Sequence, residues 1–211
     1  MQTRKGQSIE DESMEIIERE IGEHPYTGFE WQVVRRIIHS TADFDFAGSN
    51  GIIFHKDAVK SGIEALRAGR NIVVDVNGVI GLLNKQNLAD YKNGVICDIS
   101  NPEVVREATR LNKTRAQTAM RMRAAEMNGG IVVIGNAPTA LMEVIQMVKE
   151  NVTRPSLIVG IPVGFVCAAE SKEELQTVDV PYITNRGRKG GSPCASAIIN
   201  ALYKILRESP S

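Results

Sequence analysis

The sequence predicts an α/β protein with three layers, in which a parallel sheet lies between two layers of helices. Short apolar runs rich in Val and Ile recur from residue 51 onward, and helix-like segments separate them. The runs do not alternate polar and apolar residues, which is typical of strands buried on both faces. Strands and helices in regular succession favour a parallel sheet with right-handed crossovers.

The first 50 residues predict two helices that precede the sheet. Isoleucines at helical spacing indicate a helix over 8–22, which Gly22 ends. A second helix is predicted from Thr27 to about His39, with Glu30 three residues after Thr27 as in a capping box. Together they form an amino-terminal extension to the sheet.

The rest of the chain has no low-complexity linker and no internal repeat, so a single domain over 1–211 is predicted. The predicted strands are 51–54, 71–76, 94–97, 131–135, 157–161 and 180–183. The predicted helices are 56–68, 79–84, 102–127, 138–150, 171–176 and 191–207. The segment 102–127 is expected to be two helices with a break near Asn112.

Composition and charge argue against several classes of protein. The chain carries 25 basic and 25 acidic residues, so its net charge gives no support for nucleic acid or an anionic membrane as a partner. The three cysteines show no CxxC or Cys/His spacing, so neither a disulfide framework nor a metal site is expected. No apolar run approaches the roughly 18 residues of a membrane span, and the amino end lacks an apolar signal core. A soluble, cytoplasmic protein is predicted.

Loops rich in Gly, Asn and Pro follow the predicted strands. One contains Asp75, Asn77 and Gly78, and another runs from Gly135 to Thr139. Such loops lie at the carboxyl edge of an open α/β sheet, where ligands bind. Glycine lets the backbone approach a ligand closely, so this edge is the predicted site.

The loop at 185–192 is the most informative of these loops. It places Arg186, Arg188 and Lys189 among three glycines, directly before a helix predicted to begin near Ser192. Backbone N–H groups at a helix start attract anions, and arginine binds carboxylates and phosphates through paired hydrogen bonds. The pattern favours an anion-binding loop, with a solvated basic turn as the alternative.

Motifs for nucleotide binding and for serine hydrolases are missing. The sequence contains no G-x-G-x-x-G, no G-x-x-x-x-G-K-[ST] and no G-x-S-x-G. A nucleotide cofactor is therefore not expected.

The three histidines differ in their setting. His24 lies in a turn before a proline and His55 begins a predicted helix, so both are interpreted as structural or exposed. His39 ends an otherwise apolar helix, where the helix dipole favours imidazolium, although arginines one turn earlier oppose that charge. On pattern alone, a structural role for His39 is the more common outcome. Asp43 and Asp45 are either orienting partners of His39 or solvated acids.

Five segments, taken together, identify a family resemblance. They are VVRRIIHSTADFDFA (33–47), NKTRAQTAM (112–120), IGNAPTAL (134–141), GIPVGFVCAAESKEEL (160–175) and NRGRKGGSPCASAIINAL (185–202). In order and without large insertions, they resemble the precorrin-8X methylmutase family, called cobalt-precorrin-8 methylmutase in the anaerobic route to cobalamin. The resemblance runs from about residue 8 to residue 207.

The resemblance implies a flavodoxin-like α/β/α sandwich that acts as a homodimer and needs no cofactor. It implies an isomerase that moves a methyl group from carbon 11 to carbon 12 of the macrocycle, giving hydrogenobyrinate or, with cobalt, cobyrinate. The family's catalytic histidine falls on His39, where it is thought to donate a proton or a hydrogen bond to a ring nitrogen. Two further active-site positions fall on Ser13 and Arg115.

The implied substrate carries a fringe of acetate and propionate carboxylates, which gives the cations of the loops natural partners. Any cobalt arrives inside the macrocycle, so no separate metal site is implied. The substrate-binding residues expected from the resemblance and from position are Ser13, Arg115, Asn136, Pro138, Thr139, Gly164, Phe165, Arg186, Arg188 and Lys189. Two alternatives stay open: a non-catalytic corrinoid-binding or carrier protein, and a different α/β enzyme such as a phosphate-ester or nucleotide-using transferase.

Overall fold

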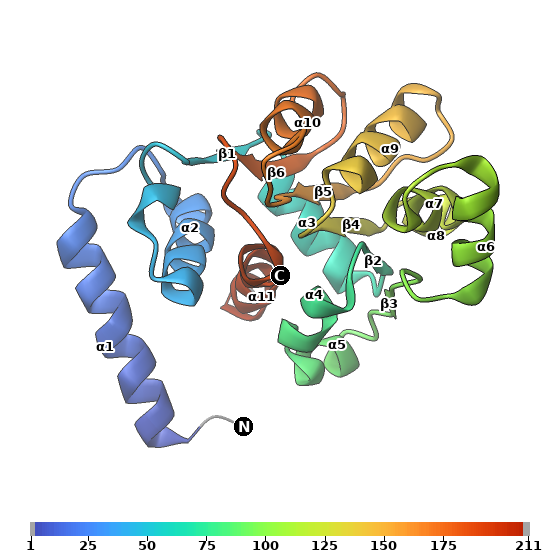
Figure 1. The fold of residues 1–211 in the computed structure, drawn as a ribbon. Coiled ribbons are helices and arrows are strands. Elements are labelled where there is room, and N and C mark those ends of the chain that lie inside the picture. Colours follow the sequence, from blue (N-terminus) through green and yellow to red (C-terminus); the bar gives the residue numbers. More distant parts are fainter. Residues whose placement is uncertain (1–2, 209–211) are drawn as a thin grey trace.

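A six-stranded sheet of order β1-β6-β5-β4-β2-β3 forms the centre of the computed structural model, which describes residues 3–208 (Figure 1). Strands β2 to β6 are parallel and follow the order of flavodoxin-like sheets. Residues 1–2 and 209–211 of the predicted domain lie outside the described residues. The strands are β1 (Ile52–Phe54), β2 (Ile72–Val74), β3 (Val95–Ile96), β4 (Ile131–Ile134), β5 (Leu157–Gly160) and β6 (Tyr182–Asn185).

Strand β1 differs from the wholly parallel sheet that was predicted, because it pairs antiparallel with β6. Ile52 lies opposite Asn185, and Phe54 lies opposite Ile183. The strand follows the amino-terminal helices and no earlier strand of the sheet, so no right-handed crossover fixes its direction. Antiparallel edge strands are common on otherwise parallel sheets.

Helices cover both faces of the sheet, as predicted. Alternate strand residues point to opposite faces: Ile72 and Val74 belong to one core, and Val73 belongs to the other. The first face is covered by α2 (Gly28–Thr41), α3 (Ala58–Arg67), α4 (Asn77–Leu82), α5 (Lys85–Asp90) and α11 (Ser192–Glu208). The second face is covered by α6 (Pro102–Leu111), α7 (Arg115–Met122), α8 (Ala124–Met127), α9 (Pro138–Lys149) and α10 (Ala168–Leu175).

The two amino-terminal helices play different parts. Helix α2 buries Val33 and Ile37 and packs against α11, so it belongs to the main core. Helix α1 (Arg4–Ile21) contacts α2, has Ile17 as its buried residue, and runs along one side of the molecule (Figure 1). Thr27 precedes α2, but its side chain makes no capping hydrogen bond, so the predicted capping box is wrong.

Two details of the helices refine the prediction. The segment 102–127 is broken at Asn112, as predicted, where the backbone has a φ of 51° and α6 ends. It is broken again at Arg123, between α7 and α8. Helix α5 was not predicted; Asn84 begins it by accepting hydrogen bonds from the N–H groups of two following residues.

Within residues 3–208, no helix has the length and apolar character needed to cross a membrane.

Candidate active site

The loops after β2 and β4 meet where the strand order reverses, which is the position at which open α/β sheets bind ligands. Asp75, directly after β2, is 1% exposed. Its carboxylate accepts hydrogen bonds from the backbone N–H groups of Gly135 and Asn136, each at 2.9 Å, and of Ala137 at 2.7 Å. Burial raises the pKa of the Asp75 carboxyl, and the three N–H groups act against that rise. Asp75 thus ties the two loops together.

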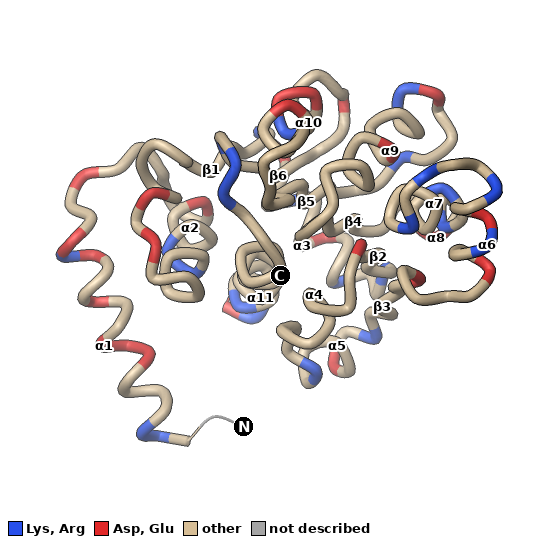
Figure 2. Tube along the Cα trace, in the orientation of Figure 1, with Lys and Arg blue, Asp and Glu red and all other residues tan. Residues whose placement is uncertain are grey.

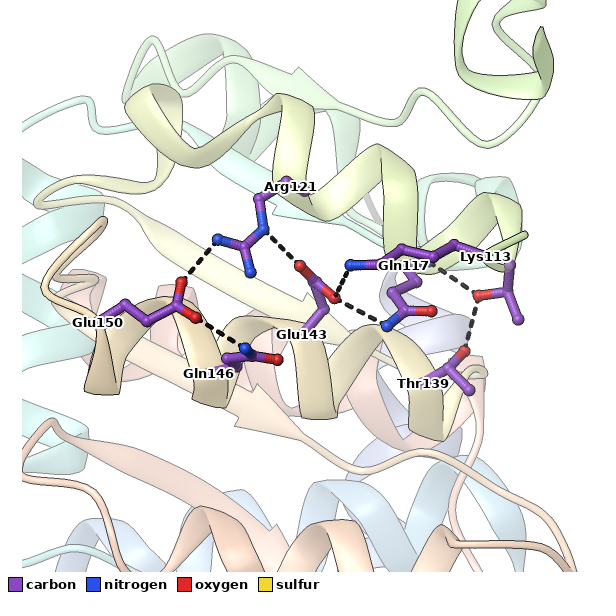
Figure 3. Close-up of polar contacts among 8 residues, drawn as sticks. Lys113, Gln117, Arg121, Thr139, Glu143, Gln146 and Glu150 are labelled. Atoms are coloured by element: carbon purple, nitrogen blue, oxygen red, sulfur yellow. Dashed lines mark hydrogen bonds and ion pairs between the residues drawn. The ribbon is translucent and has the colours of Figure 1, made fainter. Parts of the chain in front are cut away.

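Arg115 and Thr139 come from different helices, and a hydroxyl pair brings them together. Thr114 caps α7 by accepting a hydrogen bond from the N–H of Gln117 at 3.1 Å. The Thr114 and Thr139 hydroxyl oxygens lie 2.9 Å apart in a second hydrogen bond. Figure 3 labels Thr139. Arg115, the first residue of α7, is exposed beside this contact. Through the neighbouring Thr114, the contact places Arg115 near the start of α9.

A buried carboxylate that the sequence did not single out holds α7 against α9. Glu143 of α9 is 1% exposed and accepts hydrogen bonds from Lys113 at 3.3 Å, from Gln117 at 2.8 Å, and from Arg121 (Figure 3). Arg121 also reaches Glu150 at 2.8 Å. Lys113, Gln117 and Arg121 are spaced four residues apart in the sequence; Gln117 and Arg121 share a face of α7, and Lys113 precedes that helix.

The predicted basic loop leads from β6 to α11 and appears as a blue segment in Figure 2. Arg186 and Arg188 are exposed. The Arg188 guanidinium lies 5.9 Å from the centre of the Phe165 ring, and the N–H of Gly164 donates to the Arg188 carbonyl at 3.2 Å. Because two segments predicted to bind the substrate meet here, the loop after β5 and the basic loop form one surface.

Lys189 makes a different contact from its two neighbouring arginines. Its ammonium lies 2.7 Å from carboxylate oxygens of both Asp43 and Asp45. These acids follow α2, at the start of the short 3-10 helix η1 (Phe44–Phe46). The interpretation of Asp43 and Asp45 as orienting partners of His39 is therefore not supported, since both carboxylates bind Lys189.

His39 lies in the last turn of α2 with a half-buried side chain. Burial lowers the pKa of His39, the charge of Arg36 lowers it further, and Glu10 opposes the shift. Arg36 forms an ion pair with Glu10 at 2.7 Å. The helix end was expected to favour imidazolium and the neighbouring arginines to oppose it; the net shift is in the direction of the arginines, with burial as its largest cause.

Three further residues, Ser13, His24 and His55, lie apart from the contacts described above. The Ser13 hydroxyl donates to the Ile9 carbonyl at 2.7 Å within α1, and no hydrogen bond joins it to the other candidate residues in the described part of the chain. His24 stacks on Trp31, with ring centres 3.7 Å apart. His55 accepts a hydrogen bond from the N–H of Asp57 at 3.3 Å. His24 and His55 thus have the local contacts expected of structural residues.

The chain is similar to known proteins over nearly its whole length. The model of the precorrin-8X methylmutase family matches residues 8–205. The cobalt-precorrin-8 methylmutase of Priestia megaterium is 47% identical over 207 residues, which cover 98% of this chain and 91% of that protein. The protein of the same name from Leptospira interrogans is 44% identical over 211 residues, covering 96% of this chain and 95% of that protein.

A solved structure agrees with these relatives. The crystal structure of precorrin-8x methyl mutase from Thermus thermophilus matches with a TM-score of 0.89 and 38% sequence identity, covering 96% of this chain and 97% of that one. Fold, motifs and full-length similarity all lead to one assignment. The chain belongs to the precorrin-8X methylmutase family.

Proposed function

We propose that the chain is an isomerase of cobalamin biosynthesis. It moves a methyl group from carbon 11 to carbon 12 of precorrin-8X, giving hydrogenobyrinate, or of cobalt-precorrin-8, giving cobyrinate. The observation that carries this proposal is the family match over residues 8–205, supported by relatives named as methylmutases. A non-catalytic corrinoid carrier with the same pocket is the alternative.

The reaction as proposed is a methyl shift within one molecule. The bond between the methyl carbon and carbon 11 breaks as the bond to carbon 12 forms, and the conjugated electrons rearrange to balance the change. No atom is gained or lost and there is no net oxidation, so the chemistry requires no separate oxidant, reductant or activated group. The protein contributes orientation, a fixed electrostatic field around the ring and exclusion of water.

His39 is the residue that we assign to polarising the macrocycle. Because its pKa is lowered, the neutral imidazole predominates near pH 7. A neutral imidazole still carries one N–H group, which can donate a hydrogen bond to a ring nitrogen. That bond withdraws electron density from the conjugated system as the methyl group migrates. We therefore propose hydrogen-bond donation by the neutral imidazole as the role of His39.

The carboxylates of the substrate find partners in the exposed cations Arg115, Arg186 and Arg188. Paired hydrogen bonds from a guanidinium to a carboxylate give both attraction and orientation. Lys189 is already bound by Asp43 and Asp45 at 2.7 Å, so we assign its charge to that contact. The residues proposed to contact the rest of the macrocycle are Ser13, Asn136, Pro138, Thr139, Gly164 and Phe165.

We propose that the active form is a homodimer. Phe165, whose ring lies beside Arg188 of the basic loop, is 86% exposed, and the next residue, Val166, is 79% exposed. Adjacent exposed apolar side chains beside a site are one feature of surfaces that a protein partner covers. A second copy placed there would exclude water from the ring, which strengthens the electrostatic interactions in the site.

The chain is further proposed to act as one domain over 1–211, since strands from most of its length share one sheet. A cytoplasmic location is proposed as well. The three cysteines are free, and this agrees with a reducing compartment.

The decisive experiment incubates the purified protein with precorrin-8X and with cobalt-precorrin-8 and follows conversion by absorption spectroscopy. Conversion of either supports the proposal; binding of both without conversion would establish the carrier instead. His39→Ala should bind the macrocycle but lower kcat by about 10²–10³-fold, the usual loss for one preorganised donor. His39→Gln, which keeps an N–H donor, should retain more activity than His39→Ala. Equal loss in both variants would point to proton transfer.

A further inference from the structure

Lys172 of α10 is a buried ammonium without a carboxylate partner. It is 1% exposed, and its Nζ donates hydrogen bonds to the backbone carbonyls of Gly187 at 3.0 Å and Lys189 at 2.6 Å. Among the described residues, no carboxylate lies within ion-pair distance of Nζ. Burial lowers the pKa of Lys172 from an ordinary value of 10.5 to about 8, and the nearby Cys194 acts in the opposite direction. Burying such a group opposes folding, so its presence requires an explanation beyond packing.

The explanation lies in the carbonyl groups of the basic loop. Besides the two carbonyls bound by Lys172, the Asn185 amide donates to the carbonyls of Arg186 at 2.8 Å and Lys189 at 3.0 Å. The fourth carbonyl, that of Arg188, accepts from the N–H of Gly164 at 3.2 Å. Every backbone acceptor of residues 186–189 is therefore bound within the protein.

This arrangement suits a loop that faces anions. The carbonyl oxygens of residues 186–189 are all hydrogen-bonded within the protein. A carboxylate that approaches the loop therefore contacts the exposed side chains of Arg186 and Arg188. Gly190 completes the turn at a φ of 158°, and a Cβ there would lie 2.3 Å from the Ile161 carbonyl oxygen. The loop thus approaches the end of β5 more closely than a side chain would allow.

The same loop connects to the helix that carries His39. Lys189, whose carbonyl binds Lys172, extends its own ammonium to Asp43 and Asp45, each at 2.7 Å. Asp43 lies four residues after His39 in the chain. A continuous set of contacts therefore leads from Lys172 through the basic loop to the segment that follows His39.

We propose that Lys172 is a positioning residue of the methylmutase site, which folds the basic loop so that Arg186 and Arg188 receive substrate carboxylates. The inference rests on the proposed function. Lys172 does not touch the substrate; it acts through the loop. Loss of its ammonium should free the carbonyl of Gly187, leave the carbonyl of Lys189 with the Asn185 amide as its donor, and let the arginines leave their binding geometry.

The test compares Lys172→Met with the wild type in steady-state kinetics on the macrocycle. The expected result is a KM about 10–100-fold higher, the equivalent of one lost charge-assisted hydrogen bond, with kcat changed much less. Lys172→Arg should recover part of the KM. The matched control is Lys149→Met, because Lys149 forms an exposed ion pair with Glu174 at 2.8 Å; its KM should stay at the wild-type value.

A second measurement keeps the inference separate from folding and from the proposed function. Hydrogen exchange of the peptide spanning 183–192, without substrate, should be faster in Lys172→Met and unchanged in Lys149→Met. If Lys172→Met does not fold, Asn185→Leu carries the same test, since Asn185 binds the same Lys189 carbonyl. Wild-type KM and wild-type exchange in a folded variant would overturn the inference. Failure of the wild type to convert either substrate would overturn the proposed function, while the exchange result would still report on the loop.

Discussion

The carboxylate of Asp75 accepts a hydrogen bond of 2.7 Å from the backbone N–H of Ala137, which joins the loops after β2 and β4. Gly135 and Asn136 donate to the same carboxylate. In nucleotide-binding proteins of this architecture, N–H groups at the equivalent strand end hold a phosphate. Here a side chain of the protein occupies them. The fold thus keeps the loop arrangement at the point where the strand order reverses. The cations proposed to bind an anionic ligand lie elsewhere.

Replacing Asp75 by Asn should destabilise the protein. The amide of Asn presents an N–H₂ group to at least one backbone donor that needs an acceptor, which costs about 1–3 kcal/mol. Asp75→Ala, which leaves all three donors unpaired, should cost more. Urea unfolding measures both effects. Asp11→Asn is the control, since exposed Asp11 accepts a hydrogen bond from Gln7 within α1, and its midpoint should not change. A wild-type midpoint for Asp75→Asn would contradict the role assigned to this carboxylate.

The pKa of His39 should respond in opposite directions to its two charged neighbours. Arg36→Met removes a positive charge that disfavours imidazolium, so the pKa should rise; Glu10→Gln removes a favourable negative charge, so it should fall. NMR titration of the imidazole measures both shifts. Arg35→Met is the matched control, because Arg35 pairs with Glu18 and should leave the titration unchanged. Shifts of the same sign in both variants would contradict this account.

The lowered pKa of His39 also has a consequence for stability. Its folded value lies below its ordinary value of 6.5, so the unfolded chain takes up a proton first as the pH falls. The free energy of unfolding therefore decreases as the pH drops from 6.5 toward the folded pKa. His39→Gln should remove this contribution, so the difference in stability between the wild type and the variant should depend on pH in that window. A difference that is constant across the window would argue against the shift.

Self-association should depend on the apolar residues beside the basic loop. Phe165→Asp places a charge where an exposed aromatic ring is proposed to be covered by a second copy, so the dimer should weaken. Sedimentation velocity measures the change. Val152→Asp is the control: Val152 is 43% exposed in the segment between α9 and β5, away from the basic loop. Equal association of the wild type and Phe165→Asp would show that Phe165 does not lie in the dimer interface.

Local patterns predicted the sheet because four of its strands, β2, β4, β5 and β6, are buried on both faces. The run Ile131–Ile134 is apolar without alternation, and the structure buries all of it. The direction of β1 was beyond such reasoning, because its partner Asn185 lies far along the chain. The break at Asn112 was predictable because a polar residue interrupted the helical pattern, and the structure places it in the left-handed region.

The site was predicted only as far as local sequence defines it. His39 could be placed at the end of a helix, but the direction of its pKa depends on burial and on Arg36, whose side-chain placement is set by tertiary structure. Asp43 could be seen near His39 in the chain, whereas its actual partner Lys189 is 146 residues away. Long-range polar contacts of this kind leave no periodic signal, so neither this pair nor the Lys172 contacts could be derived from spacing.

In the ion-pair network of Glu143, the acid and its cations differ in how strongly each depends on the other. The Glu143 side chain is 0% exposed, whereas the side chains of Lys113 and Arg121 are 35% and 33% exposed. Burial raises the pKa of Glu143, but hydrogen bonds from Arg121, Gln117 and Lys113 outweigh it, and the net pKa is lowered. The carboxylate therefore depends on its donors, while the cations can reach water without it.

Removing Lys113 and Arg121 should therefore lower the free energy of unfolding more than removing Glu143 does. Lys113→Met combined with Arg121→Met leaves a buried carboxylate with Gln117 as its donor and should lower the free energy of unfolding by about 3–5 kcal/mol. Glu143→Met replaces the charge by an apolar side chain of similar size and should cost well under half of that, because both cations stay hydrated. Urea unfolding at pH 7 measures the difference.

The stability difference between the wild type and the double variant should also depend on pH. The folded pKa of Glu143 lies below its ordinary value of 4.5, so the stabilisation by its donors is complete above 4.5 and is lost as the pH falls through the folded pKa. The gap between the wild type and the double variant should therefore narrow in acid, since a protonated Glu143 no longer needs cations. If Glu143→Met were the less stable variant at pH 7, the network would stabilise the contact of α7 with α9 through the acid itself, and the proposed asymmetry would be wrong.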